Sequence, residues 1–469
     1  MRYVSTRGQA PVLDFSEVLL AGLARDGGLY LPESWPRLNA SQISHWRGLS
    51  YGALAKAVMT PFVGTAIAPA TLERIVDEAV AEFGHPAVAP LVQLDANLWL
   101  MELFHGPTLA FKDYALQLVG RLFDHVLAER GRRITIVTAT SGDTGSAAIE
   151  ACRDRAAIDI FVLHPKGRVS EVQRRQMTTV DAPNVHNIAI DGTFDDCQDL
   201  VKALFADLAF ADEVGLSAVN SINWARIMAQ IVYYVWAGLA LGAPDRPVAF
   251  AVPTGNFGNV YAGHVAAHMG LPVNRLIIGS NRNDILARFL TSQGRMETRP
   301  VEPSLSPSMD IQVSSNFERL LFETLDRDGT AVDVTMKQFR TDGRLDVSAD
   351  RFEAIRREFS GARVSDEETL ATIRRVHDKS GILLDPHTAV GLAAGLACRP
   401  AADIPVVCLA TAHPAKFPDA VEKATGVRPS LPPRLADLFE RAETCDSLAN
   451  DVDRLRRYIR STLGGSRAA

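Results

Sequence analysis

The chain has 469 residues, too many for one simple hydrophobic core, so about two to four domains are expected. Its 47% hydrophobic and 22% charged residues are typical of a globular protein, and its net charge of −6 excludes the basic surface that nucleic-acid binding needs. No apolar run reaches the roughly 20 residues of a membrane-spanning helix. We therefore predict neither a nucleic-acid nor a membrane partner.

The N-terminal sequence MRYVSTRGQAP lacks the apolar segment of a secretory signal. The five cysteines lie far apart and form no CxxC pair, which favours small buried side chains in a reducing compartment over disulfides or a zinc site. The eleven histidines form no HExxH or HxH motif, so no metal site is expected. These features together predict a cytoplasmic protein without a metal.

The chain begins with a pattern typical of an N-terminal lobe. A short strand is expected over 2–5, and a second, buried one over 29–31 follows the Asp-Gly-Gly turn at 26–28. From about Leu98 short apolar runs alternate with amphipathic helices. The expected strands are 98–103, 134–137, 158–163, 247–252, 276–279 and 405–410, and the expected helices include 112–127 and one from near Val260.

Strands that alternate with helices imply parallel sheets with helices on both faces. In such sheets ligands bind at the loops that leave the carboxyl ends of the strands. Three loops satisfy this rule: 138–146, 253–259 and 411–418. The residues from Pro429 onward are charged and predict a solvated surface helix.

The loop PTGNFGN at 253–259 follows an apolar strand and precedes a helix. Its two glycines allow positive φ angles, so consecutive N–H groups can point into one concavity at the helix N-terminus and bind a phosphate. The loop lacks the GK[ST] ending of a nucleotide P-loop and the GxGxxG spacing of a dinucleotide site. A tight strand-to-helix turn without a ligand is the alternative interpretation.

Two further segments carry candidate residues. The loop TATSGDTGS at 138–146 is rich in hydroxyls that suit a second anion, although Asp143 there would repel one and instead suits a helix cap.

Lys112 stands between Phe111 and Asp113 at the start of a helix. Burial and a helix N-terminus both favour the neutral amine that forms a Schiff base with a carbonyl cofactor. An ordinary surface lysine is the alternative interpretation.

Eight ordered segments together resemble the threonine synthase family, in its longer fungal and bacterial branch. They cover nearly the whole chain up to Phe417, and they are DGGLYLPE (26–33), HGPTLAFKD (105–113), TATSGDTGSAA (138–148), VNSINWARI (219–227), PTGNFGN (253–259), SMDIQVSSNFERL (308–320), DPHTAVG (385–391) and TAHPAKF (411–417).

The resemblance implies an α/β fold, that of the fold-type II pyridoxal-phosphate (PLP) enzymes similar to the tryptophan synthase β subunit. Two αβα domains, each around a parallel sheet, would accompany the N-terminal lobe. The implied segments are an N-terminal lobe at 1–92, the cofactor lysine with a smaller α/β domain at 93–245, a large PLP-binding domain at 246–428 and a helical tail at 429–469.

The resemblance also implies roles for single residues. Lys112 matches the lysine that carries the cofactor as a Schiff base, and Thr411 matches the hydroxyl that bonds the pyridine nitrogen. The loop that holds the cofactor phosphate corresponds to Gly255, Asn256, Phe257, Gly258 and Asn259. The residues that hold the phosphate and carboxylate of the substrate correspond to Ser141, Thr144, Asn220 and Arg226. Shorter relatives have an asparagine, which bonds the cofactor's 3′ oxygen, where Asp143 stands.

The implied activity is the conversion of O-phospho-L-homoserine and water to L-threonine and phosphate, with Lys112 as the group that moves protons at Cα, Cβ and Cγ. Two alternatives remain at this point. A phospho-lyase of the same family would release 2-oxobutyrate, and a non-catalytic sensor would only bind PLP or a phosphometabolite. The expected assembly is a monomer or a homodimer.

Overall fold

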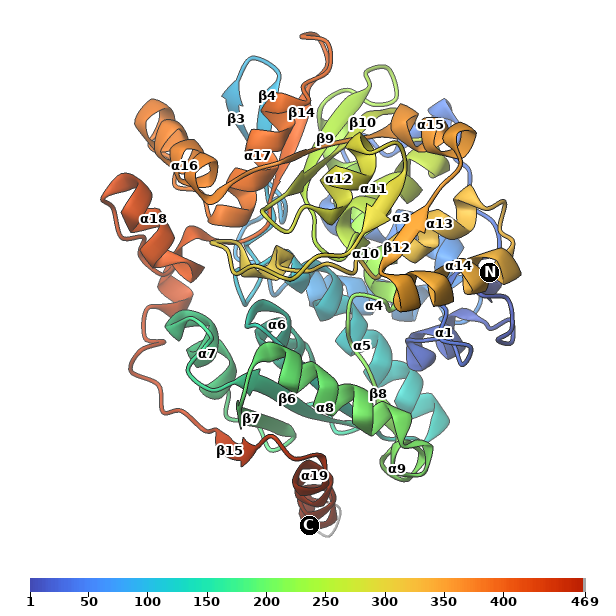
Figure 1. The fold of residues 1–469 in the computed structure, drawn as a ribbon, viewed down its shortest axis with the longest axis vertical. Helices are drawn as coiled ribbons and strands as arrows, with labels where there is room; N and C mark the ends of the chain where they lie inside the picture. Colours follow the sequence, from blue (N-terminus) through green and yellow to red (C-terminus); the bar gives the residue numbers. More distant parts are fainter. Residues whose placement is uncertain (467–469) are drawn as a thin grey trace. The chain divides into compact units, whose positions relative to one another are not determined.

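The computed structural model describes residues 1–466, with side chains up to residue 464, and forms two compact units (Figure 1). Unit 1 comprises 1–18, 23–115 and 221–429, and unit 2 comprises 19–22, 116–220 and the residues from 430 onward. These units group the chain differently from the predicted segments 1–92, 93–245, 246–428 and 429–469. Residues 1–92, apart from 19–22, fall within the same unit as 246–428, and 93–245 is divided between both.

Unit 1 is built around a six-stranded sheet. Its strands, in spatial order, are β13 (Phe359–Arg363), β10 (Val273–Ser280), β9 (Val248–Pro253), β14 (Val406–Ala410), β4 (Leu98–Glu102) and β3 (Leu91–Asp95). All neighbours are parallel except β3 and β4. Every residue of β9 and β14 is buried, as expected for parallel strands covered on both faces. The four strands predicted in this region are confirmed.

The helices of unit 1 flank this sheet. They are α10 (Trp224–Ala240), α11 (Gly258–Met269), α12 (Ile285–Thr291), α13 (Phe317–Thr324), α14 (Gly329–Asp342), α15 (Ala349–Glu358), α16 (Asp366–Ser380), α17 (Pro386–Ala397) and α18 (Pro418–Thr425). The hairpin of β11 (Arg295–Glu297) and β12 (Arg344–Asp346) and the 3-10 turns Pro307–Met309 and Pro414–Lys416 complete it.

The N-terminal residues form a small lobe that belongs to unit 1 except for residues 19–22. The predicted strands are present as the antiparallel pair β1 (Tyr3–Ser5) and β2 (Tyr30–Pro32). Four helices accompany them, namely α1 (Phe15–Ala21), α2 (Ala40–His45), α3 (Tyr51–Val63) and α4 (Pro69–Val80). Buried Arg7 contacts Glu318 at 2.9 Å and so ties the lobe to helix α13.

Unit 2 holds a five-stranded, fully parallel sheet. Its strands, in spatial order, are β15 (Asp446–Ala449), β7 (Val185–Asp191), β6 (Ile158–Pro165), β5 (Ile134–Ala139) and β8 (Leu216–Ser217). The helices are α6 (Asp143–Cys152), α7 (Glu171–Thr178), α8 (Phe194–Ala206), α9 (Leu208–Val214) and α19 (Val452–Ser466), and the 3-10 turn is Pro433–Leu435. Helix α5 (Lys112–Arg130) begins in unit 1 and continues into unit 2.

The C-terminal residues are not the solvated tail that their charge predicted. Strand β15 adds to the edge of the sheet beside β7. Helix α19 buries Leu455, Ile459 and Leu463 in the hydrophobic core of unit 2. The spacing of these three residues places them on one face of the helix, so the charged residues line only the opposite face.

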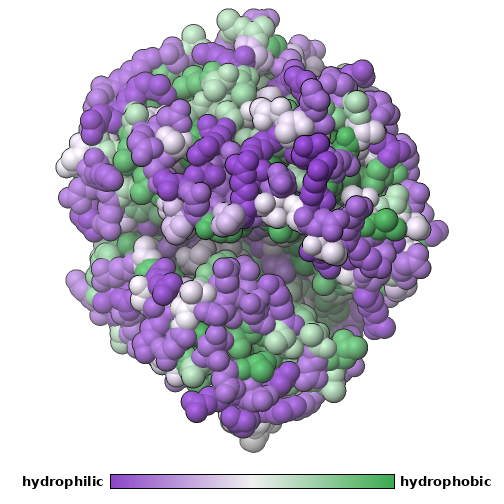
Figure 2. Space-filling model, in the orientation of Figure 1, coloured by the Kyte–Doolittle hydropathy of each residue, from purple (hydrophilic) through white to green (hydrophobic). Residues whose placement is uncertain are grey.

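The surface view agrees with the composition. Figure 2 shows a face on which hydrophilic side chains predominate and hydrophobic ones are scattered. Among the described helices, each is too short or too polar to cross a membrane. All five cysteines are free; Cys152, Cys197 and Cys408 are buried as expected, whereas Cys445 is exposed.

Candidate cofactor and substrate site

Two of the predicted loops leave neighbouring strands at the same edge of the six-stranded sheet. In the parallel pair β9 and β14, Ala251 lies opposite Cys408, so both strands end two residues later, at Pro253 and Ala410. Adjacent strands are about 4.8 Å apart. The glycine loop after β9 and Thr411 after β14 are therefore neighbours at the carboxyl edge, where parallel sheets bind ligands (Figure 1).

The segment before Lys112 is fastened to the loop after β14. The N–H of Phe111 donates to the carbonyl of Thr411 at 2.9 Å, and the N–H of His413 donates to the carbonyl of Leu109 at 3.0 Å. The ammonium of Lys416, which is fully buried, donates to the carbonyl of Thr108 at 2.7 Å. These three bonds bring the start of α5 to the same edge of the sheet.

Lys112 itself is the first residue of α5 and is only 8% exposed, so a surface lysine is excluded. Its Nζ lies 5.2 Å from the centre of the Phe111 ring. The neighbouring carboxylate of Asp113 is fully buried and accepts hydrogen bonds from the N–H (2.8 Å) and the hydroxyl (2.6 Å) of Thr108. Leu109 adopts a left-handed conformation with φ of 63°, which a branched side chain keeps only where the surroundings enforce it.

The backbone angles of the glycine loop differ from the predicted ones. Neither glycine has a positive φ; Phe257 takes that conformation instead, with φ of 62°, as the N-cap of α11. Its ring packs 5.6 Å from that of Phe317 and 5.7 Å from that of Phe359. Glycine is needed at 255 for space, because a Cβ atom there would lie 2.9 Å from the carbonyl oxygen of Ser308.

A set of hydrogen bonds holds this loop from behind. The amide of Asn316 donates to the carbonyl of Asn256 at 2.9 Å, and the hydroxyl of Ser314 donates to the carbonyl of Gly255 at 2.7 Å. Arg319 is fully buried and in turn donates to the side-chain oxygen of Asn316. The C=O and N–H of a trans peptide point in opposite directions. Because the carbonyls of Gly255 and Asn256 accept these bonds, the N–H groups of Asn256 and Phe257 point away from Ser314 and Asn316.

The loop residues fit a phosphate group. The first N–H groups of a helix have no acceptor within the helix and carry partial positive charge. Asn259, in the first turn of α11, is 7% exposed, and within the described part of the chain its side-chain nitrogen has no hydrogen-bond acceptor. Its side-chain oxygen accepts from the hydroxyls of Tyr233 (2.6 Å) and Tyr234 (2.9 Å), which fixes the amide with the NH₂ group as the remaining donor.

Thr411 is buried and its backbone is fixed on both sides. Its carbonyl accepts from Phe111, and its N–H donates to the hydroxyl of Thr388 at 3.2 Å. Thr388 donates to the fully buried carboxylate of Asp385, which also accepts from a ring nitrogen of His387 at 2.9 Å. This chain of polar side chains sets the position of Thr411 beneath the edge of the sheet.

The hydroxyl-rich loop of unit 2 joins β5 to α6. Thr140 caps the helix, since its hydroxyl accepts from the N–H groups of Gly142 (2.9 Å) and Gly145 (2.8 Å). Asp143 is therefore not the cap that its position suggested; it is the buried first residue of α6 and accepts from the amide of Gln173 at 2.8 Å. Ser141 and Thr144 are half-buried on the same turn.

The last two predicted residues flank the start of α10. Asn220 is exposed and ends unit 2, whereas Arg226 lies in the first turn of α10 in unit 1 and is 4% exposed. Burial lowers the pKa of Arg226 to about 10, so its guanidinium remains charged at neutral pH. A buried, charged guanidinium is a donor of the kind that suits the phosphate or carboxylate of a substrate.

Three family models together match most of the chain. Residues 2–80 match the model described as "Threonine synthase N terminus", 84–341 match "Pyridoxal-phosphate dependent enzyme" and 388–459 match "Threonine synthase, C-terminal". The chain is 59% identical to a threonine synthase of Pseudomonas aeruginosa over 98% of both chains. The chain belongs to the threonine synthase family.

Solved structures of the threonine synthase family agree in fold. A PLP-bound threonine synthase from Brucella melitensis is 57% identical and superposes with a TM-score of 0.96 over 98% of this chain and 99% of the other. The yeast threonine synthase structure is 39% identical, with a TM-score of 0.93 over 99% of both chains. The predicted fold-type II PLP architecture is confirmed, and the cofactor is pyridoxal 5′-phosphate.

Several residues of this site were missed by sequence reasoning. Asn316, Thr388 and Lys416 all lie in motifs that resembled the threonine synthase family, yet no role was predicted for them. Each positions a predicted site segment through a buried hydrogen bond to its backbone. Their signal in the sequence was a polar residue within a matched motif, which does not by itself say which backbone group it meets.

Proposed function

We propose that this protein is a threonine synthase that converts O-phospho-L-homoserine and water to L-threonine and phosphate in the cytoplasm. The observation that carries the proposal is the convergence of Lys112, the 255–259 loop and Thr411 at one edge of the sheet. Membership of the threonine synthase family at 59% identity supports the choice of substrate.

We assign the cofactor contacts as follows. Lys112 would carry the cofactor as a Schiff base, the hydroxyl of Thr411 would bond the pyridine nitrogen, and Gly255, Asn256, Phe257, Gly258 and Asn259 would hold the cofactor phosphate. When bound, the cofactor ring accepts the electron pair that is left as protons leave the substrate carbons. A neutral hydroxyl at the pyridine nitrogen, rather than a carboxylate, would keep that withdrawal moderate.

Lys112 would also act as the acid and base of the reaction. Once freed by the substrate amine, Nζ of Lys112 would take the proton from Cα and pass it to an oxygen of the phosphate. It would then take one proton from Cβ as the phosphate leaves Cγ, and return that proton to Cγ. Water would add its hydroxyl at Cβ, and its remaining proton would return to Cα through Nζ. Lys112 is buried at the start of α5, which keeps its amine near the carboxyl edge of the sheet.

We assign the substrate's two anionic groups to Ser141, Thr144, Asn220 and Arg226. A guanidinium offers two parallel N–H donors that suit the oxygens of a phosphate, and the first turn of α6 adds hydroxyls and N–H groups. After the C–O bond breaks, the phosphate would stay near Arg226 and help to activate the water molecule.

Product analysis tests this function. Purified protein supplied with PLP and O-phospho-L-homoserine should release L-threonine and phosphate in equal amounts. Release of 2-oxobutyrate without threonine would identify the phospho-lyase. The relatives named threonine synthase-like 2 are 37% identical to this chain, less than the 59% of the Pseudomonas aeruginosa threonine synthase. Absence of any product would favour the non-catalytic sensor. Gel filtration with light scattering separates the monomer from the homodimer.

A further inference from the structure

Two histidines of helix α11 lie beside a glutamate of helix α13. His264 and His268 are four residues apart, which places them on one face of the helix, and their ring centres are 4.1 Å apart. One potential ligand atom from each of His264, His268 and Glu323 lies within 4.8 Å of the others. Two imidazoles with this helical spacing and a carboxylate from another element form a known type of metal-binding set.

Both histidine rings are oriented by hydrogen bonds from their Nδ1 atoms. Nδ1 of His264 lies 2.8 Å from Oε1 of Glu358, and Nδ1 of His268 lies 3.0 Å from the carbonyl oxygen of His264. Both oxygens accept, so each Nδ1 donates its hydrogen and a metal would bind at Nε2, which in His264 already lies beside Oε2 of Glu323. Metal-binding histidines characteristically donate their other nitrogen to a carboxylate or carbonyl in this way.

The distance between the first two ligand atoms also suits a metal. Nε2 of His264 lies 3.5 Å from Oε2 of Glu323, at the long limit of a hydrogen bond. Tetrahedral zinc with bonds of about 2.0–2.1 Å separates its ligands by about 3.3–3.4 Å. The Glu323 carboxylate is itself held by the Tyr261 hydroxyl (2.5 Å) and the Trp35 indole (3.0 Å).

We propose that His264, His268 and Glu323 bind one divalent transition-metal ion of the zinc type, with Glu358 orienting His264. The sequence predicted no metal site because the HExxH pattern is absent; the third ligand comes from a different helix far along the chain. His268 is half-buried, and bringing its ligand atom from at most 4.8 Å to tetrahedral spacing takes a shift of up to about 1.4 Å.

The position of the site indicates a structural rather than a catalytic ion. His264 lies six residues beyond Gly258, about 9 Å along the helix at 1.5 Å per residue, and so outside the phosphate loop. Helix α13 directly follows Asn316, which holds that loop from behind. A metal bridging α11 and α13 would therefore stiffen the support of the loop, and we expect it to raise the melting temperature.

Metal titration of the PLP-loaded enzyme tests this proposal. After treatment with a chelator, the protein should bind one Zn²⁺ per chain in competition with a chromophoric chelator, and Co²⁺ should give the visible bands of a tetrahedral site. His268→Gln and Glu323→Gln should each weaken zinc binding at least tenfold, whereas His377→Gln, at a half-buried histidine outside the cluster, should leave it unchanged. All variants carry Cys445→Ser, which removes an exposed thiol that also binds zinc.

Two results would overturn the proposal. Absence of saturable Zn²⁺ and Co²⁺ binding would mean that the cluster is only a hydrogen-bonded network of ion pairs. Binding that persists in both variants would place the metal elsewhere. Circular dichroism establishes that each variant is folded, and if Glu323→Gln does not fold, the half-buried His268→Gln alone decides.

Discussion

Replacement of Gly255 with alanine tests whether the glycine loop holds the cofactor phosphate. The added Cβ atom would lie 2.9 Å from the carbonyl oxygen of Ser308 and 3.3 Å from Cα of Met309, whereas ordinary contacts begin near 3.4 Å. The two chain segments must therefore separate by about 0.5 Å. Both obstacles are backbone atoms, so no side-chain rotation relieves the contact.

The segment opposite Gly255 is fixed by hydrogen bonds of its own. The N–H of Ser308 donates to His387 at 3.2 Å, and the N–H of Met309 donates to the carbonyl of Ser306 at 2.9 Å. We therefore expect the loop itself to move. A shift of 0.5 Å would lengthen N–H to phosphate hydrogen bonds from about 2.9 Å to about 3.4 Å, beyond their effective range.

Overpacking of this kind costs about 1–3 kcal/mol, equivalent to a loss of PLP affinity of roughly ten- to a hundredfold. Titration of the cofactor-free protein with PLP, followed by absorbance, measures this change. Gly464→Ala is the matched control, because a Cβ atom there meets open space on α19. An affinity for PLP within twofold of wild type in Gly255→Ala would refute the assignment of the loop.

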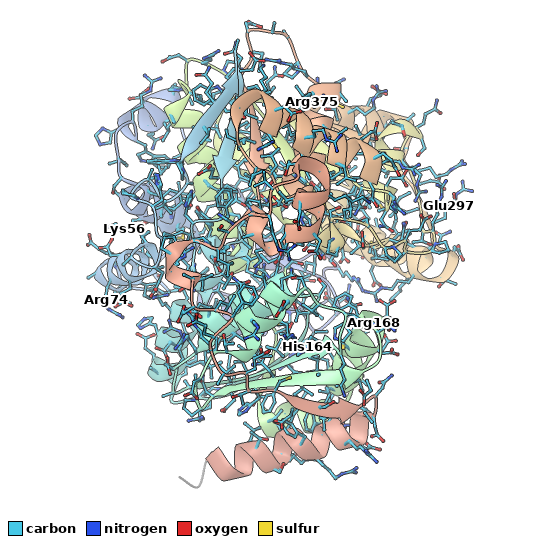
Figure 3. All side chains as sticks on the ribbon, turned by 90° about the vertical axis from the view of Figure 1, so that its left-hand side faces the viewer. Lys56, Arg74, His164, Arg168, Glu297 and Arg375 are labelled. Carbon is cyan, nitrogen blue, oxygen red and sulfur yellow. The ribbon has the colours of Figure 1, made fainter. Side chains whose placement is uncertain are left out.

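Three other predictions concern single side chains. Lys112→Ala should abolish the visible absorbance of the cofactor and lower activity about a thousandfold or more, measured against the exposed control Lys337→Ala. Asn316→Ala should remove one hydrogen bond from Arg319 and the side-chain bond to the Asn256 carbonyl, and weaken PLP binding by about 1–3 kcal/mol, measured by the same titration; unchanged affinity would contradict its supporting role. Burial, aided by Arg174, lowers the pKa of His164 (Figure 3) to about 4, so stability should be full above about pH 6.5 and fall by up to about 3 kcal/mol as the pH drops to 4. Urea unfolding at several pH values should show a smaller loss in His164→Gln, and an equal loss would contradict this origin.

The parallel sheets were predictable because their central strands are short, continuous apolar runs. Strand β13, FSGAR, escaped prediction because it lies at an edge and has a glycine and two polar residues. Helix α19 was expected to be solvated because its charges dominate the sequence locally. Its three apolar residues are buried because β15 pairs with β7 and places the C-terminal residues beside the core of unit 2. The local sequence does not show that contact.

The sequence indicated the loop and the lysine of the site, but not the distant side chains that hold them in position. The strand-to-helix loop indicated a phosphate cradle, yet the positive φ falls on Phe257, whose ring is held by Phe317 and Phe359 from distant segments. In the same way, nothing near Lys112 in sequence indicates that Lys416 and Thr411 fasten it to β14. Such contacts depend on strand order, which local patterns do not contain.

The fate of the water oxygen tests the proposed reaction most directly. The reaction is run with O-phospho-L-homoserine in water enriched in the heavy oxygen isotope, and both products are analysed by mass spectrometry. Because water adds at Cβ after the C–O bond at Cγ has broken, we expect one labelled oxygen in the hydroxyl of L-threonine and none in the released phosphate. Label in the phosphate, with homoserine as the other product, would show simple phosphate-ester hydrolysis and contradict the assignment.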